Sequence, residues 1–174
     1  ENLMHYDPAV AGGSYGATTN HTYDADGNRA SLMSPTGEVH YTYTQRNQLK
    51  QVLHYTDVLA TYSYNADGTL STKSLLNGTT ASHTYDAAGQ HTMVNHTGPG
   101  GAPLKRRDYL YNNMGNRTAM QHDAGLWDVY GYDAVDQLTS AKYSASNSAG
   151  ASPASTTTYQ YDPVGNRQQT IVTG

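Results

Sequence analysis

The sequence contains no cysteine and no phenylalanine, and it has a single tryptophan. Without cysteine the chain can form neither a disulfide nor a thiolate metal site. Leu, Ile, Val and Phe together account for 22 of the 174 residues. This is below the share of about 20% under which disorder becomes a serious alternative. No apolar run approaches the roughly 20 residues that a membrane-spanning helix needs, so we expect no membrane span.

Tyrosine supplies the apolar area that the aliphatic residues do not. The chain has 16 tyrosines and a formal net charge of only −4 at pH 7, a balance that argues against disorder. Each ring can bury on the order of 150–250 Å². We therefore expect a tyrosine core whose hydroxyls reach backbone groups, Asn and Gln side chains or a wet cavity.

One short pattern recurs seven times and organises the chain. A tyrosine is followed by a turn-forming residue, two variable residues and then glycine, asparagine or aspartate. Successive tyrosines are 20, 21, 21, 26, 21 and 29 residues apart, which predicts one supersecondary unit per repeat. These anchor tyrosines are Tyr23, Tyr43, Tyr64, Tyr85, Tyr111, Tyr132 and Tyr161. The residues four positions later are Gly27, Asn47, Gly68, Gly89, Gly115, Asp136 and Gly165.

Each repeat is predicted to be a β-hairpin. Two residues before every anchor lies another ring, and this spacing places both rings on one face of a strand. These rings are His21, Tyr41, Tyr62, His83, Tyr109, Tyr130 and Tyr159. The residue after the anchor is mostly one whose side chain bonds backbone N–H groups ahead of it, and glycine tolerates a left-handed backbone. A type I turn followed by a left-handed residue fits this pattern best.

The fold class predicted from these signals is all-β, a sheet of serial antiparallel hairpins. We expect an array over residues 21–174, with inserts near 98–103 and 144–155, and an irregular segment or degenerate repeat over residues 1–20. Period-two alternation supports the strands. They are expected over 38–43, 48–55, 59–64, 69–76, 80–85, 90–97, 104–111, 125–132, 155–161 and 166–172. Shorter second connections are expected at residues 56–58 and at the Asn-Gly pair of residues 77–79.

The repeats YDADGNR, YNNMGNR and YDPVGNR resemble the YD repeat of RHS and teneurin proteins. The resemblance spans about residues 21–174 in seven in-register copies. It implies hairpins that wind into a curved or spiral sheet, as part of a hollow shell around a toxin cargo or of a cell-surface scaffold. It also implies a secreted or cell-surface protein of bacterial type whose partners are further YD repeats or a protein cargo. Self-association through sheet edges is the other expected contact.

Two departures from that family bear on function. Its shells contain many more than seven repeats, so this chain is expected to be a segment of a larger shell or a small relative. The self-cleaving core of RHS proteins carries an Asp-Pro-x-Gly-Leu motif, whereas Asp162-Pro163-Val164-Gly165 is followed here by Asn166. We therefore expect an ordinary repeat at this position and no self-cleavage.

Two chemical alternatives compete with a purely structural interpretation. Asp24, Asp26 and Asn28 could ligate calcium, but an EF-hand loop has its glycine at the sixth position, whereas Gly27 is fourth after the anchor. The eight histidines lack the spacing of a zinc protease, so no metal site or cofactor is expected.

The second alternative is a glycan-binding module or polysaccharide lyase, for which His83, Tyr85 and Arg107 are the candidate residues. It requires a Tyr/His/Arg set that departs from repeat register and converges in a cleft.

The net charge is negative, so the basic trio of residues 105–107 is expected at a solvated strand rather than at nucleic acid.

Overall fold

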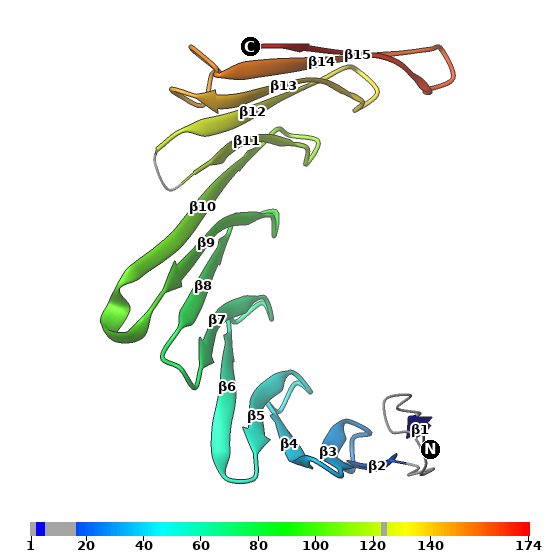
Figure 1. Ribbon diagram of the computed structural model, residues 1–174, viewed down its shortest axis with the longest axis vertical. Coiled ribbons are helices and arrows are strands. Elements are labelled where there is room, and N and C mark those ends of the chain that lie inside the picture. Colours follow the sequence, from blue (N-terminus) through cyan, green and yellow to red (C-terminus); the bar gives the residue numbers. More distant parts are fainter. Residues whose placement is uncertain (1–2, 6–16, 123–124) are drawn as a thin grey trace, which may run out of the picture. The chain divides into compact units, whose positions relative to one another are not determined.

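The computed structural model describes residues 3–5, 17–122 and 125–174 (Figure 1). Two compact units are formed, one by the residues up to Thr80 with Gly98–Gly100, the other by Ala81–Thr97 with Gly101–Gly174. All regular elements of the described residues are strands, apart from one 3₁₀ turn, η1 (Pro99–Gly101). None of these residues belongs to a helix that is long and apolar enough to cross a membrane.

The first unit is an antiparallel sheet in which each strand pairs with the next one along the chain. Its strands are β1 (Leu3–His5), β2 (Ala17–Tyr23), β3 (Arg29–Ser34), β4 (Gly37–Tyr43), β5 (Leu49–His54), β6 (Asp57–Tyr64) and β7 (Leu70–Leu75). Because each repeat contributes two strands, the repeat turns of this unit lie along one border of its sheet (Figure 1).

The second unit has the same organisation. Its strands are β8 (Thr80–Tyr85), β9 (His91–Thr97), β10 (Pro103–Tyr111), β11 (Arg117–Gln121), β12 (Trp127–Tyr132), β13 (Leu138–Ala145), β14 (Ser155–Tyr161) and β15 (Arg167–Thr173). From β9 to β15 each strand is antiparallel to its neighbour in sequence.

The anchor tyrosines lie where the strand register shifts. Thr22 pairs with Ser31, but Tyr23 pairs with Arg29, so one residue of β3 has no partner. The same shift occurs at Tyr43, Tyr64, Tyr111, Tyr132 and Tyr161. A one-residue bulge bends and twists the strand that carries it. The repeats therefore introduce a bend at regular intervals.

Burial is shallow throughout the described sheets. The fully buried apolar residues are small, namely Ala60, Ala119, Ala141 and Ala145, and no large side chain is fully buried. Most tyrosines are half-buried between strands instead. Stability in such a sheet comes from contacts between adjacent repeats rather than from a central core.

The predicted all-β array of serial antiparallel hairpins is confirmed. One predicted connection is wrong: Asp57 and Val58 belong to β6, and the chain reverses at Tyr55 and Thr56. Tyr55 has a φ of 52°, and a left-handed residue allows such a short reversal. The loop predicted over 144–155 is also shorter, since β13 continues to Ala145.

The N-terminal prediction can be compared with only part of the structure. Of residues 1–20, the first two and 6–16 lie outside the described residues. Leu3–His5 form β1, which pairs with the start of β2 through the Leu3–Thr19, Met4–Thr18 and His5–Ala17 positions.

Candidate functional site

Seven similar turns are the recurring feature from which any site must be built. In the first turn, the Asp24 N–H donates to the Asn28 carbonyl at 2.9 Å, and the Gly27 N–H donates to the Asp24 carbonyl at 3.1 Å. All seven turns repeat this pair of bonds. The fourth residue after each anchor has a positive φ: Gly27 83°, Asn47 57°, Gly68 94°, Gly89 77°, Gly115 87°, Asp136 63° and Gly165 91°. These residue types are the ones that adopt a left-handed backbone at low cost.

The side chain after the anchor closes most turns a second time. Asp24 Oδ1 accepts the N–H groups of Asp26 and Asn28 at 3.0 and 2.8 Å, and its Oδ2 accepts the Asn28 side-chain amide at 3.1 Å. Both carboxylate oxygens of Asp24 thus accept hydrogen bonds from within the turn. Asp24 is one of the residues weighed above as alternative calcium ligands. Within the described residues, no group of three His, Cys, Asp or Glu side chains could hold a metal ion.

The turn bonds also act on carboxylate ionisation. At Asp162 the side-chain amide and the N–H of Asn166 donate to the carboxylate and lower its pKa. At Asp24 burial alone would raise the pKa, but hydrogen bonds from Asn28 and Asp26 outweigh it and the pKa is lowered. The ionised carboxylate is therefore the form that holds these turns.

The anchor hydroxyls join neighbouring repeats. Tyr43 Oη donates to the Arg29 carbonyl at 2.9 Å, and Tyr64 Oη donates to the Leu49 carbonyl at 2.8 Å. In each case the acceptor is the sixth residue after the preceding anchor. The second unit has three further bonds of this kind, Tyr111 to His91, Tyr132 to Arg117 and Tyr161 to Leu138, each 2.9 Å long. Phenylalanine would fill the same space but could not donate, which gives a physical reason for tyrosine at these anchors.

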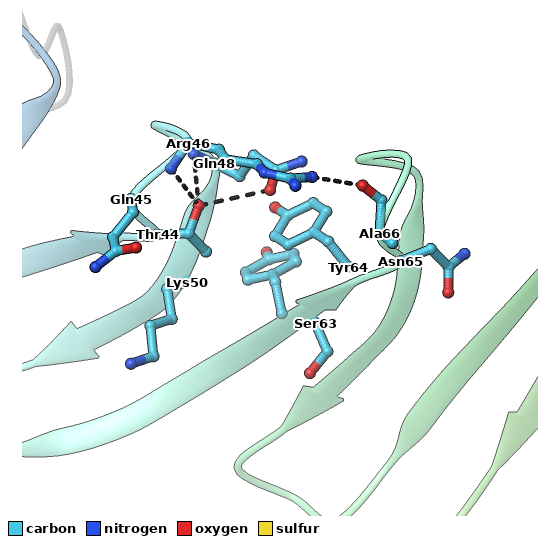
Figure 2. A pocket seen from close by; sticks show the side chains of 10 residues that line it. Thr44, Gln45, Arg46, Gln48, Lys50, Ser63, Tyr64, Asn65 and Ala66 are labelled. Carbon is cyan, nitrogen blue, oxygen red and sulfur yellow. Dashed lines mark hydrogen bonds between the residues drawn. The ribbon is translucent and has the colours of Figure 1, made fainter.

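A shallow cavity lies between two adjacent turns of the first unit. It has a volume of about 390 Å³ and is lined by residues 44–46, 48, 50 and 62–66. Figure 2 shows Arg46 reaching from its own turn to the Ala66 carbonyl, at 2.5 Å from Nη1. The side chains that line the cavity, Tyr64 among them, come from the two turns and the adjoining strands. Several of them form hydrogen bonds to one another and to backbone groups.

In three hairpins of the second unit, the ring before the anchor contacts a side chain eight residues later, across its own hairpin. The Arg117 guanidinium lies 4.3 Å from the Tyr109 ring centroid, and that of Arg167 lies 5.6 Å from Tyr159. Both are cation–π contacts. Pairs at this offset occupy equivalent repeat positions.

His83 and His91 form a third pair at this offset. His83 Nδ1 and His91 Nε2 are 3.0 Å apart, and the ring centroids are 5.1 Å apart. Burial lowers the pKa of both histidines; the charge of His91 adds to the effect at His83, and that of Arg117 adds to it at His91. Two protonated rings at this distance would repel each other, so the neutral forms are favoured, in which one ring donates its N–H to the bare nitrogen of the other.

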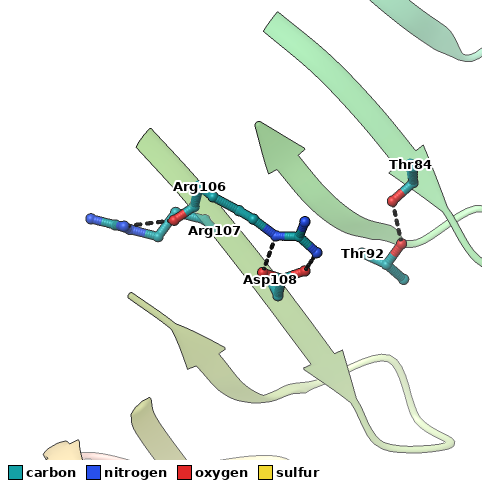
Figure 3. Close-up of polar contacts among 5 residues, drawn as sticks. All are labelled: Thr84, Thr92, Arg106, Arg107 and Asp108. Atoms are coloured by element: carbon teal, nitrogen blue, oxygen red, sulfur yellow. Dashed lines mark hydrogen bonds and ion pairs between the residues drawn. The ribbon is translucent and has the colours of Figure 1, made fainter. Parts of the chain in front are cut away.

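The three residues predicted for a glycan or lyase site are only partly brought together. The His91 ring lies 5.1 Å from Tyr85, and it also contacts His83. Arg107 instead donates to the Arg106 carbonyl at 2.7 Å. Figure 3 shows its guanidinium pointing away from Thr84 and Thr92, and shows Arg106 bound to Asp108.

Sequence reasoning missed His91, Tyr109 and Arg117 in this cluster. His91 lies between Tyr85 and Tyr109, at 5.1 and 5.7 Å from their centroids. The eight-residue offset across each hairpin was the signal that could have identified His91 and Arg117. These residues follow the repeat register, so their convergence is a consequence of hairpin packing.

One buried polar contact does not follow the repeats. His122 Nε2 lies 2.8 Å from Asp128 Oδ2, and Asp128 is 8% exposed. The other carboxylate oxygen accepts the Ser144 N–H at 3.1 Å, where Ser144 has a φ of 53°. Asp128 thereby connects the start of β12 to the irregular end of β13.

No protein-family model matches the sequence. No curated protein matches it either. Solved structures do match: the crystal structure of TcdB2-TccC3 at 19% identity and a TM-score of 0.75, and that of TcdB2-TccC3 without its hypervariable C-terminal region at 20% and 0.74. A Photorhabdus luminescens Tc holotoxin pore matches at 18% identity and a TM-score of 0.73.

Each match covers 90% of this chain but only 9% of the other chain. At such low identity the likeness concerns the fold, and it confirms the predicted YD-repeat fold.

Proposed function

We propose that this chain is a structural segment of a YD-repeat shell or surface scaffold, which with further YD repeats encloses a protein cargo or mediates interactions. The observation that carries the proposal is the series of anchor hydroxyls. Five of the seven anchor hydroxyls join a repeat to the repeat before it, as Tyr64 does to Leu49 at 2.8 Å. A unit that presents the same donor and the same acceptor can be extended repeat by repeat.

The similar solved structures support this proposal. They include a Tc holotoxin pore, and the chain spans 9% of the protein that it matches there. A chain that matches only a small part of a much longer protein has the length expected of a segment of such a protein. On the same basis we propose a secreted or cell-surface location in a bacterial setting.

The placement of the ionisable and aromatic residues supports a structural role over catalysis. His83, His91 and Arg117 occupy repeat positions, and each faces a ring or a histidine across its hairpin. A lyase needs a base and an acid converging on one substrate. Rings and cations that recur at each hairpin stabilise the sheet instead.

The last strand offers the contact surface. All seven residues of β15 are exposed, and Ile171 and Val172 are 42% and 68% exposed. Among the described strands, β15 pairs only with β14. An exposed strand edge with apolar side chains pairs readily with another strand. We propose that the strand edge nearest residues 159–172 receives a further YD repeat, or in isolation another copy of this chain through its strand edge nearest residues 21–43.

Sedimentation velocity over a wide concentration range tests this surface. The unsubstituted chain is expected to self-associate as its concentration rises. The Ile171→Lys variant should remain monomeric, because a charged edge opposes strand pairing. Val164→Lys, at an 82% exposed turn position, is the matched control and should associate like the unsubstituted chain. If the unsubstituted chain is a compact monomer at every concentration, the proposal is contradicted.

A further inference from the structure

Where the residue five positions after an anchor is Asn or Gln and another turn follows, its side chain reaches toward that turn; Thr69, at the same position after Tyr64, bonds Asn65 and Asp67 of its own turn instead. In the first unit Asn28 Nδ2 donates to Asn47 Oδ1 at 3.1 Å. Gln48 Nε2 donates to the Gly68 carbonyl at 2.9 Å. Both contacts connect the fifth position of one turn to the fourth position of the following turn.

The second unit repeats both kinds of contact. Asn116 Nδ2 donates to Asp136 Oδ1 at 2.6 Å. The side-chain amide nitrogens of Gln90 and Gln137 each lie 3.1 Å from where a Cβ on Gly115 or Gly165 would be. Glutamine therefore again faces glycine, and asparagine again faces a residue with a side-chain oxygen.

The sizes of the two partners are complementary. Asparagine is one methylene shorter than glutamine, and it meets an acceptor that extends from the neighbouring turn, as at Asn28 and Asn47. Gln48 reaches the backbone carbonyl of Gly68 itself and crowds the space that a side chain at position 68 would need. At Gly68 a Cβ would lie 3.3 Å from the Gln48 amide nitrogen, closer than ordinary van der Waals contact.

We propose that this pairing determines which YD turn can lie beside which. An Asn at the fifth position selects a neighbour with Asn or Asp at its fourth position, and a Gln selects glycine. A Gln facing Asn or Asp would be crowded. An Asn facing glycine would leave its amide short of the carbonyl and without this bond.

The rule also specifies the partner of the last turn, and this part rests on the proposed function. Asn166 Nδ2 donates to Asp162 Oδ2 at 2.9 Å, just as Asn28 Nδ2 donates to Asp24 Oδ2 at 3.1 Å. An amide has two N–H groups, and Asn28 uses its second for Asn47. Asn166 is therefore prepared for a YD repeat that carries Asn or Asp, rather than glycine, at the fourth position.

The rule within the chain is tested by a double-mutant cycle at Gln48 and Gly68. Gln48→Asn and Gly68→Asn should each speed amide hydrogen exchange in the two turns, and the double variant should recover most of the lost protection. Gln51→Asn makes the same chemical change on strand β5 and should leave both turns protected. Exchange in the double variant equal to the sum of the single effects would overturn the rule.

The partner is tested by extending the full chain after Gly174 with a copy of residues 35–54, carrying either the original Asn at the copy of position 47 or glycine there. The Asn version should protect the added strands from exchange more strongly than the glycine version. Equal protection of the two versions would overturn the rule but leave the proposed function standing. No protection in either version would contradict the proposed function itself.

Discussion

Removing a single anchor hydroxyl should loosen one contact between repeats without changing how the ring packs. Tyr64→Phe deletes only the Oη that donates to the Leu49 carbonyl at 2.8 Å. The ring remains available for packing, and the carbonyl of Leu49 loses its partner from the next repeat. This substitution isolates the bond from the apolar area that the ring buries.

The expected magnitude follows from the energetics of such a bond. A typical intramolecular hydrogen bond contributes about 0.5–1.5 kcal/mol net, so we expect Tyr64→Phe to lower the free energy of unfolding by about 1 kcal/mol. For a chain of this size, that loss corresponds to a fall in Tm of about 2–4 °C.

A second readout comes from alkaline pH. Burial, with a smaller contribution from Tyr62, raises the pKa of Tyr64 above its ordinary value of 10.0. Above that pH the unfolded tyrosine loses its proton before the folded one, so the stability present below about pH 10 is lost as the pH rises. Tyr64→Phe should reduce this alkaline loss.

Circular dichroism melting and hydrogen exchange around residue 49 measure these effects. Tyr23→Phe is the matched control, because Tyr23 is 58% exposed and is the first of the seven anchors, so none of these repeats precedes it to supply the carbonyl acceptor. A Tyr64→Phe chain that melts and exchanges like the Tyr23→Phe chain would refute the hydroxyl argument.

Three further outcomes are expected. Gly89→Ala should lower the free energy of unfolding by about 1–2 kcal/mol through left-handed strain, because Gly89 has a φ of 77° and open space around it; an unchanged denaturation midpoint would argue against the turn geometry. The lowered pKa of His83 means that stability present above about pH 6.5 is lost as the pH falls below it, and His83→Tyr should reduce this loss in denaturant titrations at a series of pH values. The purified chain should keep its mass on incubation, as mass spectrometry can check, and a fragment abolished by Asp162→Asn would show self-cleavage.

The repeat signals in the sequence predicted most of the fold. The tyrosine and glycine spacings carry the information for the hairpins, since both the turn geometry and the strand alternation are local properties. Strands β3, β11 and β13 were harder to identify because their sequences, such as Arg117–Gln121, mix small and polar residues without clear alternation. Their place in the sheet depends on pairing with neighbours.

The candidate site was less predictable, for a different physical reason. His83 and Tyr85 were identified by their repeat positions, but Arg107 was grouped with them from residue type alone. Its guanidinium bonds the Arg106 carbonyl, and the cation that reaches the ring of Tyr109 is Arg117. Which side chain meets a ring depends on hairpin register, which composition does not contain.

The pairing of Asn28 with Asn47 was likewise outside the reach of single motifs. Each turn is recognisable by itself, but the size match appears only when consecutive turns lie next to each other. A comparison of the fifth position of one repeat with the fourth position of the next would have exposed it. Such contacts are long-range within the sequence although they recur regularly.

The central claim, that anchor hydroxyls hold the array together, is tested most directly by changing five of them to phenylalanine at once. The substituted residues are Tyr43, Tyr64, Tyr111, Tyr132 and Tyr161. A control chain carries phenylalanine at Tyr23, Tyr41, Tyr55, Tyr62 and Tyr109. Hydrogen exchange of the two chains should show protection lost throughout the anchor variant and retained in the control, because the effects of well-separated contacts add. Equal protection in both chains would contradict the claim.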